Sequence, residues 1–169
     1  GSGAGAVAAA RLLPDVQLQL IDINPLALDF ARVNLRHAGL EAELSSGSGL
    51  EKVEDSFDLV IANPPFMHDA NERAYRHGGR ELGSAVSVDW AVTAARQVAP
   101  GGRVLLYTGS AIVDGVDQLE LTLRERLQGR GCNLRYAEID PDIFGEQLDE
   151  PGYEAVERIA CVGLVIDRV

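Results

Sequence analysis

The stretch Asp58-Leu59-Val60-Ile61-Ala62-Asn63-Pro64-Pro65-Phe66 decides how the rest of this chain is interpreted. Its apolar run predicts a buried strand over residues 57–62. The two prolines end that strand, because neither can donate a ladder hydrogen bond. The chain therefore leaves the sheet at Asn63 in a stiff, extended turn. That turn offers a side-chain amide, backbone carbonyls free of sheet pairing and an aromatic ring, which are the groups needed to hold a flat, nitrogen-bearing ligand.

The composition is typical of one globular domain, and we assign residues 1–169 to it. The chain is 46% hydrophobic and 24% charged, which suits a sizeable core. No apolar run approaches the roughly 20 residues of a membrane span, and no signal peptide is visible. Two cysteines make no disulfide framework, so a reducing, cytoplasmic setting is expected. The net charge of -11 disfavours non-specific nucleic-acid binding by this chain alone, although a separate basic domain would supply it.

Helical and extended segments are predicted to alternate. Helices are expected over 6–13, 25–37, 84–98 and 116–127, and strands over 16–22, 41–44, 57–62, 103–107, 132–139 and 159–166. Asn24 and Pro25 suit the start of the second helix, and Gly39 suits its end. That helix is expected to place four apolar residues mostly on one side, namely Leu26, Phe30, Val33 and Leu35.

This order of elements predicts an α/β fold with a mostly parallel sheet covered on both faces. The last strand follows its predecessor without an intervening helix, so it is expected to run antiparallel. Residues 63–83 form a long connection, which is often a functional lid. The acidic loop at 140–157 contains no Lys or Arg. Phe144 and Tyr153 are expected to pin it to the body of the protein.

The chain opens with a glycine-rich loop, Gly1-Ser2-Gly3-Ala4-Gly5, directly before a helix. Asp22, at the end of the next strand, is placed to accept hydrogen bonds from ribose hydroxyls. The pattern predicts an adenosine-containing cofactor, which can be a nicotinamide, a flavin or S-adenosylmethionine. The alternative is a helix-capping loop beside a surface aspartate. Such a loop normally follows a strand, so we expect a fragment of a longer chain, in which an N-terminal segment or domain supplies the first strand.

The glycine loop, Asp22 and the Asn-Pro-Pro-Phe turn together resemble the Rossmann-like (class I) S-adenosylmethionine-dependent methyltransferases. The resemblance is strongest to the group whose fourth strand ends in Asn-Pro-Pro-aromatic. That group includes glutamine-amide methyltransferases of release factors and ribosomal proteins, adenine exocyclic-amine methyltransferases and guanine-amine methyltransferases of ribosomal RNA. The resemblance covers essentially the whole chain and implies S-adenosyl-L-methionine as the cofactor.

The resemblance also implies roles for individual residues of the catalytic turn, Asn63, Pro64, Pro65 and Phe66. The Asn63 side-chain oxygen and the Pro64 carbonyl accept the two N–H groups of the target nitrogen, which turns its lone pair toward the methyl group. Phe66 stacks on the planar target. Positioning and fixed dipoles then supply most of the rate enhancement.

The implied cofactor contacts are Gly1, Gly3, Gly5, Asp22, Ile23, Ser48 and Asn63. The glycines pass beneath the methionine part, Asp22 holds the ribose and Ile23 packs on the adenine. Ser48, or alternatively Gly47, stands where the family often has Asp or Asn, which is a departure from the pattern. No metal is expected, because His68 and His77 lack a ligand-spaced partner set.

A basic cluster follows the motif, made of Arg73, Arg76, His77 and Arg80. It predicts either an anion contact for the substrate or a solvated loop neutralised by Glu72 and Glu81. The substrate class stays open between a protein glutamine and a nucleobase. Two alternatives to an N-methyltransferase also remain: a cofactor-binding scaffold that is not catalytic, and a nicotinamide-dependent oxidoreductase.

Overall fold

The computed structural model describes residues 1–49, 56–69, 73 and 76–169. The chain forms two compact units, Gly1–Val53 and Glu54–Val169, which we call the N-terminal and C-terminal units and describe separately. The assignment of residues 1–169 to one domain stays a prediction. No helix in the described ranges is long and apolar enough to cross a membrane. Cys132 and Cys161 are both free thiols.

The N-terminal unit contains α1 (Ala4–Leu12), β1 (Gln19–Asp22), α2 (Pro25–His37) and β2 (Glu43–Ser46). The two strands are parallel, with Asp22 opposite Ser46. The start of α2 is as predicted: the Asn24 side chain accepts a hydrogen bond of 3.0 Å from the Leu26 N–H, and Pro25 occupies the first turn. Gly39 ends this helix with φ +71°, a conformation that glycine adopts without steric cost.

Three of the four apolar residues that were expected mostly on one side of α2 are exposed. Leu26, Phe30 and Val33 are 56–63% exposed, and only Leu35 is buried. The buried side chains of α2 are Leu28, Ala31 and Leu35. These residues also follow helical spacing, and the helix contacts both β1 and β2. The sequence offered two apolar stripes, and the position of the two-stranded sheet decided which one is buried.

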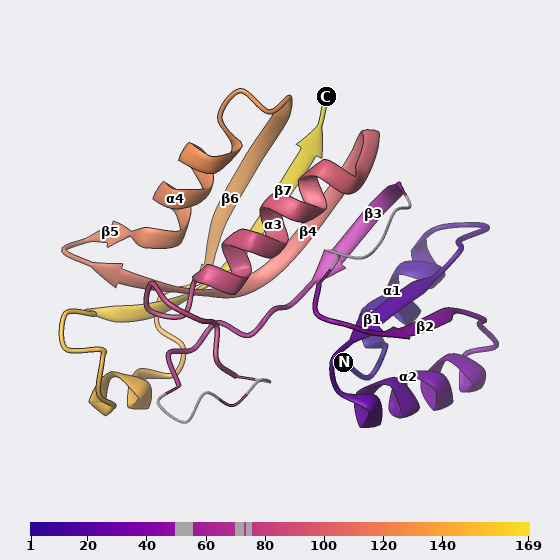
Figure 1. Ribbon diagram of the computed structural model, residues 1–169, viewed down its shortest axis with the longest axis horizontal. Helices are drawn as coiled ribbons and strands as arrows, with labels where there is room; N and C mark the ends of the chain where they lie inside the picture. Colours follow the sequence, from indigo (N-terminus) through magenta and orange to yellow (C-terminus); the bar gives the residue numbers. More distant parts are fainter. Residues whose placement is uncertain (50–55, 70–72, 74–75) are drawn as a thin grey trace. The chain divides into compact units, whose positions relative to one another are not determined.

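The C-terminal unit holds the larger sheet (Figure 1). Its elements are β3 (Phe57–Ala62), α3 (Ala85–Gln97), β4 (Val98–Val113), β5 (Val116–Asp117), α4 (Gln118–Leu127), β6 (Cys132–Asp140), the 3₁₀ helix η1 (Gly145–Asp149) and β7 (Arg158–Arg168). The strand order is β3-β4-β7-β6, with β5 also paired to β4. Strand β3 is parallel to β4, whereas β7 is antiparallel to both β4 and β6. The predicted antiparallel last strand is therefore confirmed.

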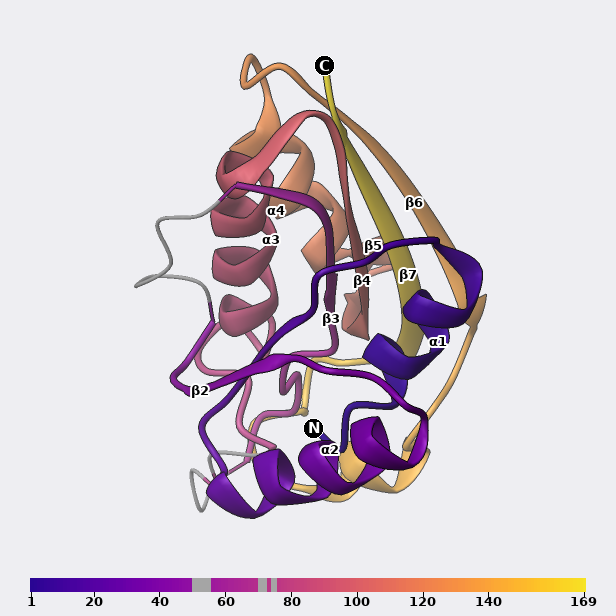
Figure 2. The ribbon, with the colours of Figure 1, turned by 90° about the vertical axis from the view of Figure 1, so that its right-hand side faces the viewer.

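Strand β4 is much longer than the predicted 103–107, because it pairs with β7 from Arg103 through Ile112. Helices α3 and α4 lie on the same side of this sheet (Figures 1 and 2). In the core between these helices and the sheet, Val104, Leu119 and Ile166 are fully buried. One polar pair lies inside this layer, where the Ser87 and Thr108 hydroxyls are 2.7 Å apart and satisfy each other.

Candidate functional site

The glycine loop of the N-terminal unit is built around Gly3. Gly3 precedes α1 with φ +80°, and a Cβ there would lie 3.2 Å from the Ala31 Cβ and 3.4 Å from a Leu20 methyl carbon. This position therefore needs glycine both for its conformation and for close packing. Gly1 has open space around it, and Gly5 lies in the first turn of α1. Gly3 is thus required by the fold of the unit itself, whereas a side chain at Gly1 would meet no neighbour.

The start of α1 has the character of an anion site. Its first intrahelical bond runs from the Val7 N–H to the Gly3 carbonyl, so the N–H groups before Val7 have no acceptor one helical turn earlier. Such N–H groups and the helix dipole favour a negatively charged ligand group. The carboxylate of an amino-acid-bearing cofactor is a group of this kind.

Asp22 lies at the end of β1 beside this loop, with its side chain 21% exposed. One carboxylate oxygen accepts a hydrogen bond of 2.8 Å from the Asn24 N–H, and the other accepts one from the amino group of Gly1. Each oxygen keeps a further lone pair for a ligand hydroxyl. The structure places Gly1 beside Asp22, and the cofactor roles of both residues stay predictions.

The other predicted cofactor residues of this unit flank Asp22. Ile23 is 46% exposed, which leaves an apolar surface for a flat ring. The backbone of Gly47 donates to the Asp22 carbonyl at 3.2 Å, so the turn after β2 lies next to β1, with Ser48 exposed. A carboxylate acceptor, an apolar surface and a hydroxyl thus lie at one end of the sheet, and this combination of groups fits an adenosine.

The Asn-Pro-Pro-Phe turn begins at the end of β3 in the C-terminal unit. Strand β3 ends at Ala62, opposite Leu106 of β4. Asn63 is exposed immediately after it, whereas Pro64 is buried. The turn is therefore anchored by its first proline, while Asn63 is exposed. This arrangement suits a polar group that must be accessible and yet fixed in place.

Phe66 is fixed against β4 and the acidic loop. A Cβ on Gly109 would lie 2.4 Å from a ring carbon of Phe66, so the ring rests directly on the bare backbone of that glycine. The Phe66 and Phe144 ring centroids are 6.0 Å apart. Phe66 also packs on a buried cluster that contains Met67, Ala111, Tyr153, Val156 and Ile159. Stacking of Phe66 on a substrate stays a prediction, and it has to use the part of the ring that these contacts leave accessible.

The loop after Phe66 folds back on the motif by close backbone contacts. The Met67 N–H donates to the Arg76 carbonyl at 3.0 Å, and the Gly78 N–H donates to the Met67 carbonyl at 2.8 Å. A Cβ on Gly78 would lie 1.8 Å from the Gly83 carbonyl oxygen and 2.7 Å from the Phe66 Cα. No side chain fits there, so glycine allows two turns of the loop to meet. The described part of this connection is therefore held firmly.

The predicted basic cluster is largely engaged with neighbouring side chains. Arg73 forms a two-pronged ion pair with the buried carboxylate of Asp69, at 2.8 and 2.7 Å, and this pairing holds the pKa of Asp69 well below its usual range. Arg76 donates to the Gln147 side chain, and the His77 Nδ1 accepts from the Asp69 N–H at 3.2 Å. Arg80 is exposed. The predicted neutralisation by Glu72 lies outside the described residues.

Asp69 is a supporting residue that the sequence did not identify, whereas Tyr153 was expected to pin the acidic loop but without a named partner. The buried Tyr153 hydroxyl accepts a hydrogen bond of 2.7 Å from the His68 N–H, which confirms that Tyr153 pins the acidic loop to the body of the unit. Asp69 is recognisable in the sequence only by an arginine four residues later. Neither residue belongs to a motif, because each acts through a fold-dependent neighbour. In the described ranges, no group of three His, Cys, Asp or Glu side chains is placed to hold a metal ion.

The fold is that of a Rossmann-like methyltransferase domain, and the chain carries a glycine loop, Asp22 at the end of β1 and an Asn-Pro-Pro-Phe turn at the end of β3. Residues 1–107 match the methyltransferase small domain family, and the chain belongs to that family. The class I S-adenosylmethionine-dependent methyltransferase predicted from the sequence is thereby confirmed at the level of family and cofactor class. This decides among the cofactors that the glycine loop alone left open.

Two curated relatives illustrate the match. The chain is 33% identical over 112 residues to a ribosomal RNA small subunit methyltransferase C of Ectopseudomonas mendocina, covering 65% of this chain and 31% of that protein. It is 28% identical over 157 residues to a release factor glutamine methyltransferase of Deinococcus radiodurans, covering 87% of this chain and 53% of that protein. The chain thus spans about a third to a half of the length of these relatives.

Solved structures show the same fold at low sequence identity. TrmN from Thermus thermophilus superposes with a TM-score of 0.63 at 23% identity, covering 100% of this chain and 42% of that one. A ribosomal protein L11 methylase from Lactobacillus delbrueckii subsp. bulgaricus gives a TM-score of 0.61 at 20% identity, covering 99% of this chain and 66% of that one. These likenesses confirm the predicted α/β methyltransferase fold.

Proposed function

We propose that the protein transfers a methyl group from S-adenosyl-L-methionine to a planar amide or exocyclic amine nitrogen. The observation that carries this proposal is the exposed Asn63 amide on a buried Pro64 anchor at the carboxyl end of β3. An amide fixed at a strand end can accept an N–H from a flat group and hold that group in one orientation. Family membership supports the choice of cofactor.

In the proposed mechanism, Asn63 and Pro64 do the positioning. The Asn63 side-chain oxygen and the Pro64 carbonyl accept the two N–H groups of the target nitrogen, whose lone pair is otherwise delocalised into its π system. Both acceptors favour the positive charge that develops on that nitrogen. S-Adenosyl-L-methionine supplies the electrophilic methyl group. The methylated nitrogen then loses a proton to solvent, so the turn needs no strong base of its own.

The cofactor-binding residues in this proposal are Gly1, Gly3, Gly5, Asp22, Ile23, Ser48 and Asn63. The start of α1 takes the carboxylate end, Asp22 accepts the ribose hydroxyls and Ile23 covers the adenine. The proposal includes a preceding segment that supplies a strand beside β1, which pairs only with β2 among the described strands. Pro65 and Phe66 complete the catalytic turn by fixing its path and its aromatic wall.

The substrate is proposed to be a protein glutamine or a nucleobase amine, in a cytoplasmic setting. The two relatives described above are named for one substrate of each kind. The acidity of the chain favours a protein substrate, because a negative surface repels phosphate backbones. The exposed Arg80 beside the motif favours a nucleic acid. A mixed assay with both substrate classes decides between them.

Two measurements test the proposal. Calorimetric titration of S-adenosyl-L-methionine should give saturable binding, and absence of binding at about 1 mM cofactor would overturn it. Asn63→Ala loses one of the proposed cofactor contacts but should still bind the cofactor. It should lower the methyl-transfer rate at saturating cofactor by about 10²- to 10³-fold, as loss of one fixed polar group typically does. Asn133→Ala, at an exposed position of β6, serves as the matched control.

A non-catalytic scaffold is the second candidate, and Ser48 is the observation that favours it. Ser48 has one hydroxyl where the family often has a carboxylate or amide, so an adenine amine finds a weaker acceptor there. A scaffold predicts cofactor binding without turnover on either substrate class. The Asn63→Ala variant separates the two cases, because it changes the rate only if the protein is an enzyme.

A further inference from the structure

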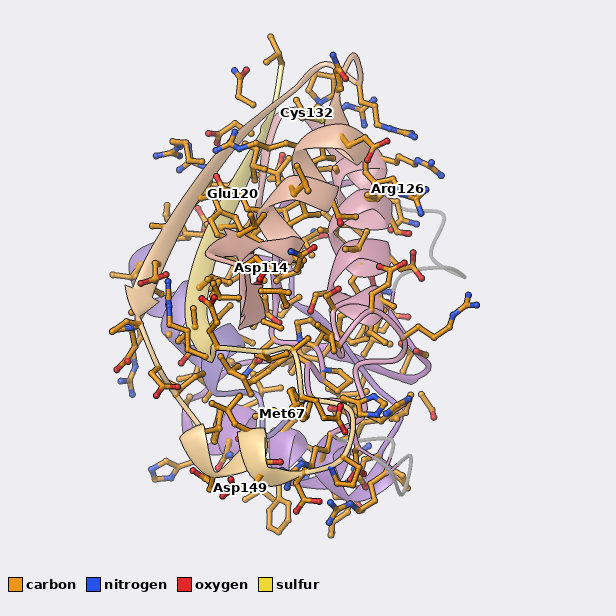
Figure 3. All side chains as sticks on the ribbon, turned by 90° about the vertical axis from the view of Figure 1, so that its left-hand side faces the viewer. Met67, Asp114, Glu120, Arg126, Cys132 and Asp149 are labelled. Atoms are coloured by element: carbon orange, nitrogen blue, oxygen red, sulfur yellow. The ribbon has the colours of Figure 1, made fainter. Side chains whose placement is uncertain are left out.

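A second polar site lies in the C-terminal unit, away from the Asn-Pro-Pro-Phe turn. It is a pocket of about 190 Å³ lined by Val92, Ala95, Arg96, Arg130, Cys132 and Arg168. These residues come from the end of α3, the turn after α4, the start of β6 and the end of β7. Figure 3 shows Cys132 at the opposite end of the unit from Met67 and Asp149.

Two of the three arginines are held in place by backbone carbonyls. The Arg168 Nη1 donates to the carbonyls of Arg96 and Val98 at 2.7 and 2.6 Å. The Arg130 Nε donates to the Arg126 carbonyl at 2.5 Å. One nitrogen of each guanidinium thus ties the side chain to the end of a helix. Within the described residues, the other N–H groups of these two guanidinium groups have no further partner, and their orientation is fixed in advance.

The charge of this pocket is unusual for the protein. The chain has 26 acidic residues against 15 Lys and Arg, and several arginines of the C-terminal unit pair with carboxylates. The arginines that line the pocket, Arg96, Arg130 and Arg168, form no ion pair within the described part of the chain. The C-terminal ends of α3 and α4 oppose an anion with only about half a negative charge each. Three guanidinium charges outweigh them.

We propose that this pocket binds a phosphate-class oxyanion. Guanidinium forks match the oxygens of phosphate in geometry and charge, and three of them line this one pocket. In sheet register, Asn63 lies level with Tyr107 and Arg168 level with Gly102. About five residues, or roughly 17 Å, therefore separate the levels of the two sites along the strands. The anion is either a backbone phosphate of a nucleic acid or free phosphate, and this inference does not depend on the proposed function.

The test uses the full chain, with inorganic phosphate as the first probe. Titration followed by NMR should show saturable shifts of residues around the pocket, weaker at high salt. Arg96→Gln should weaken phosphate binding by about tenfold or more, because it removes one fork while its backbone carbonyl still binds Arg168. Arg11→Gln, on exposed α1, is the matched control. Arg130→Gln is a second variant in case Arg96→Gln does not fold, which circular dichroism checks.

A labelled single-stranded RNA oligonucleotide is the second probe and distinguishes the source of the phosphate. If RNA binds the wild type and is displaced by phosphate, and neither is seen with Arg96→Gln, the pocket binds the backbone of a nucleic acid. Phosphate binding without RNA binding assigns it to free phosphate. No phosphate shifts in wild type up to about 50 mM, or equal affinity in wild type and both variants, would refute the site.

Discussion

The two units hold their predicted site residues by different means. Among the described residues, the buried apolar side chains of the N-terminal unit all belong to α2, whereas those of the C-terminal unit come from two helices, two strands and the loops beside them. Asp22 accepts a hydrogen bond from the Asn24 N–H at a sheet end where its side chain is 21% exposed. Phe66, in contrast, rests on Gly109 and a buried cluster.

This difference suggests a division of tasks. A cofactor that binds and leaves at each turnover needs accessible polar groups, which the N-terminal unit presents. In the proposed reaction, a weakly nucleophilic nitrogen needs acceptors whose position does not relax, and the packing of Pro64 and Phe66 next to Asn63 contributes to that. We therefore expect substitutions in the C-terminal unit to have larger effects on stability than matched substitutions in the N-terminal unit.

The largest difference in the free energy of unfolding is expected between alanine substitutions of two glycines. Gly78→Ala places a Cβ 1.8 Å from the Gly83 carbonyl oxygen and must separate two backbone segments, which should cost about 3 to 5 kcal/mol. Gly47→Ala meets only an Ile21 methyl carbon at 3.4 Å, an ordinary contact, and should change stability by less than about 0.5 kcal/mol. Urea unfolding of both variants measures the contrast. Equal losses would mean that the loop after Phe66 is not rigid.

A smaller difference in the free energy of unfolding is expected between alanine substitutions of two helix-capping residues. Asn24 caps α2 by one bond, from the Leu26 N–H, and Asn24→Ala should cost about 1 kcal/mol. Asp117 caps α4 through the Glu120 N–H and also accepts from the Ser110 and Tyr136 hydroxyls. Asp117→Ala should therefore cost about 2 to 3 kcal/mol, because it leaves buried donors without an acceptor.

Thermal and urea unfolding compare the two cap variants. Burial, together with the Asp117 carboxylate, raises the pKa of Tyr136, so this phenol remains a donor throughout the measurable range. Tyr136→Phe combined with Asp117→Ala should recover part of the loss, since fewer donors are then left unpaired. Strictly additive losses would contradict a shared network around Asp117.

The sequence predicted the local features of the fold better than its packing. Strand β3, the cap at Asn24 and the Asn-Pro-Pro-Phe turn depend on neighbouring residues, and all are found where the sequence placed them. The sequence did not show which face of α2 is buried, because Leu28 and Leu26 lie on two apolar stripes of the same helix. Only a strand from elsewhere in the chain selects between them.

For the site as well, the sequence predicted local features better than contacts between distant residues. Asp22 and Asn63 follow from motif and spacing, and both lie at strand ends as expected. The pairing of Asp69 with Arg73, and of Tyr153 with the His68 N–H, depends on how a long connection folds back. Tyr153 is 85 residues from its partner, and no local pattern predicts such a contact.

The third prediction concerns that hydroxyl. Tyr153→Phe removes the acceptor of the partly buried His68 N–H and should cost about 1 to 2 kcal/mol. Tyr107 is 46% exposed, so Tyr107→Phe should cost less than about 0.5 kcal/mol. Differential scanning calorimetry of both variants gives the comparison. A Tyr153→Phe variant as stable as Tyr107→Phe would show that water replaces the lost contact.

The smallest effect near neutral pH is expected in the pH dependence of the stability that Asp69 contributes. The Arg73 side chain lowers the pKa of Asp69 from its ordinary value of 3.8. A carboxyl with a depressed folded-state pKa stabilises the fold fully above its unfolded-state pKa and loses that contribution as the pH falls through the folded-state value. The stability advantage of wild type over Asp69→Asn should therefore be constant from about pH 7 to pH 5 and shrink below about pH 4.

Urea midpoints of both proteins across this range measure this advantage. The pKa of the Asp167 carboxyl is also lowered by arginines, but its contribution cancels in the difference. An advantage that grows on acidification would mean that Asp69 is protonated in the folded protein, and the ion pair with Arg73 would then not be what holds the loop after Phe66.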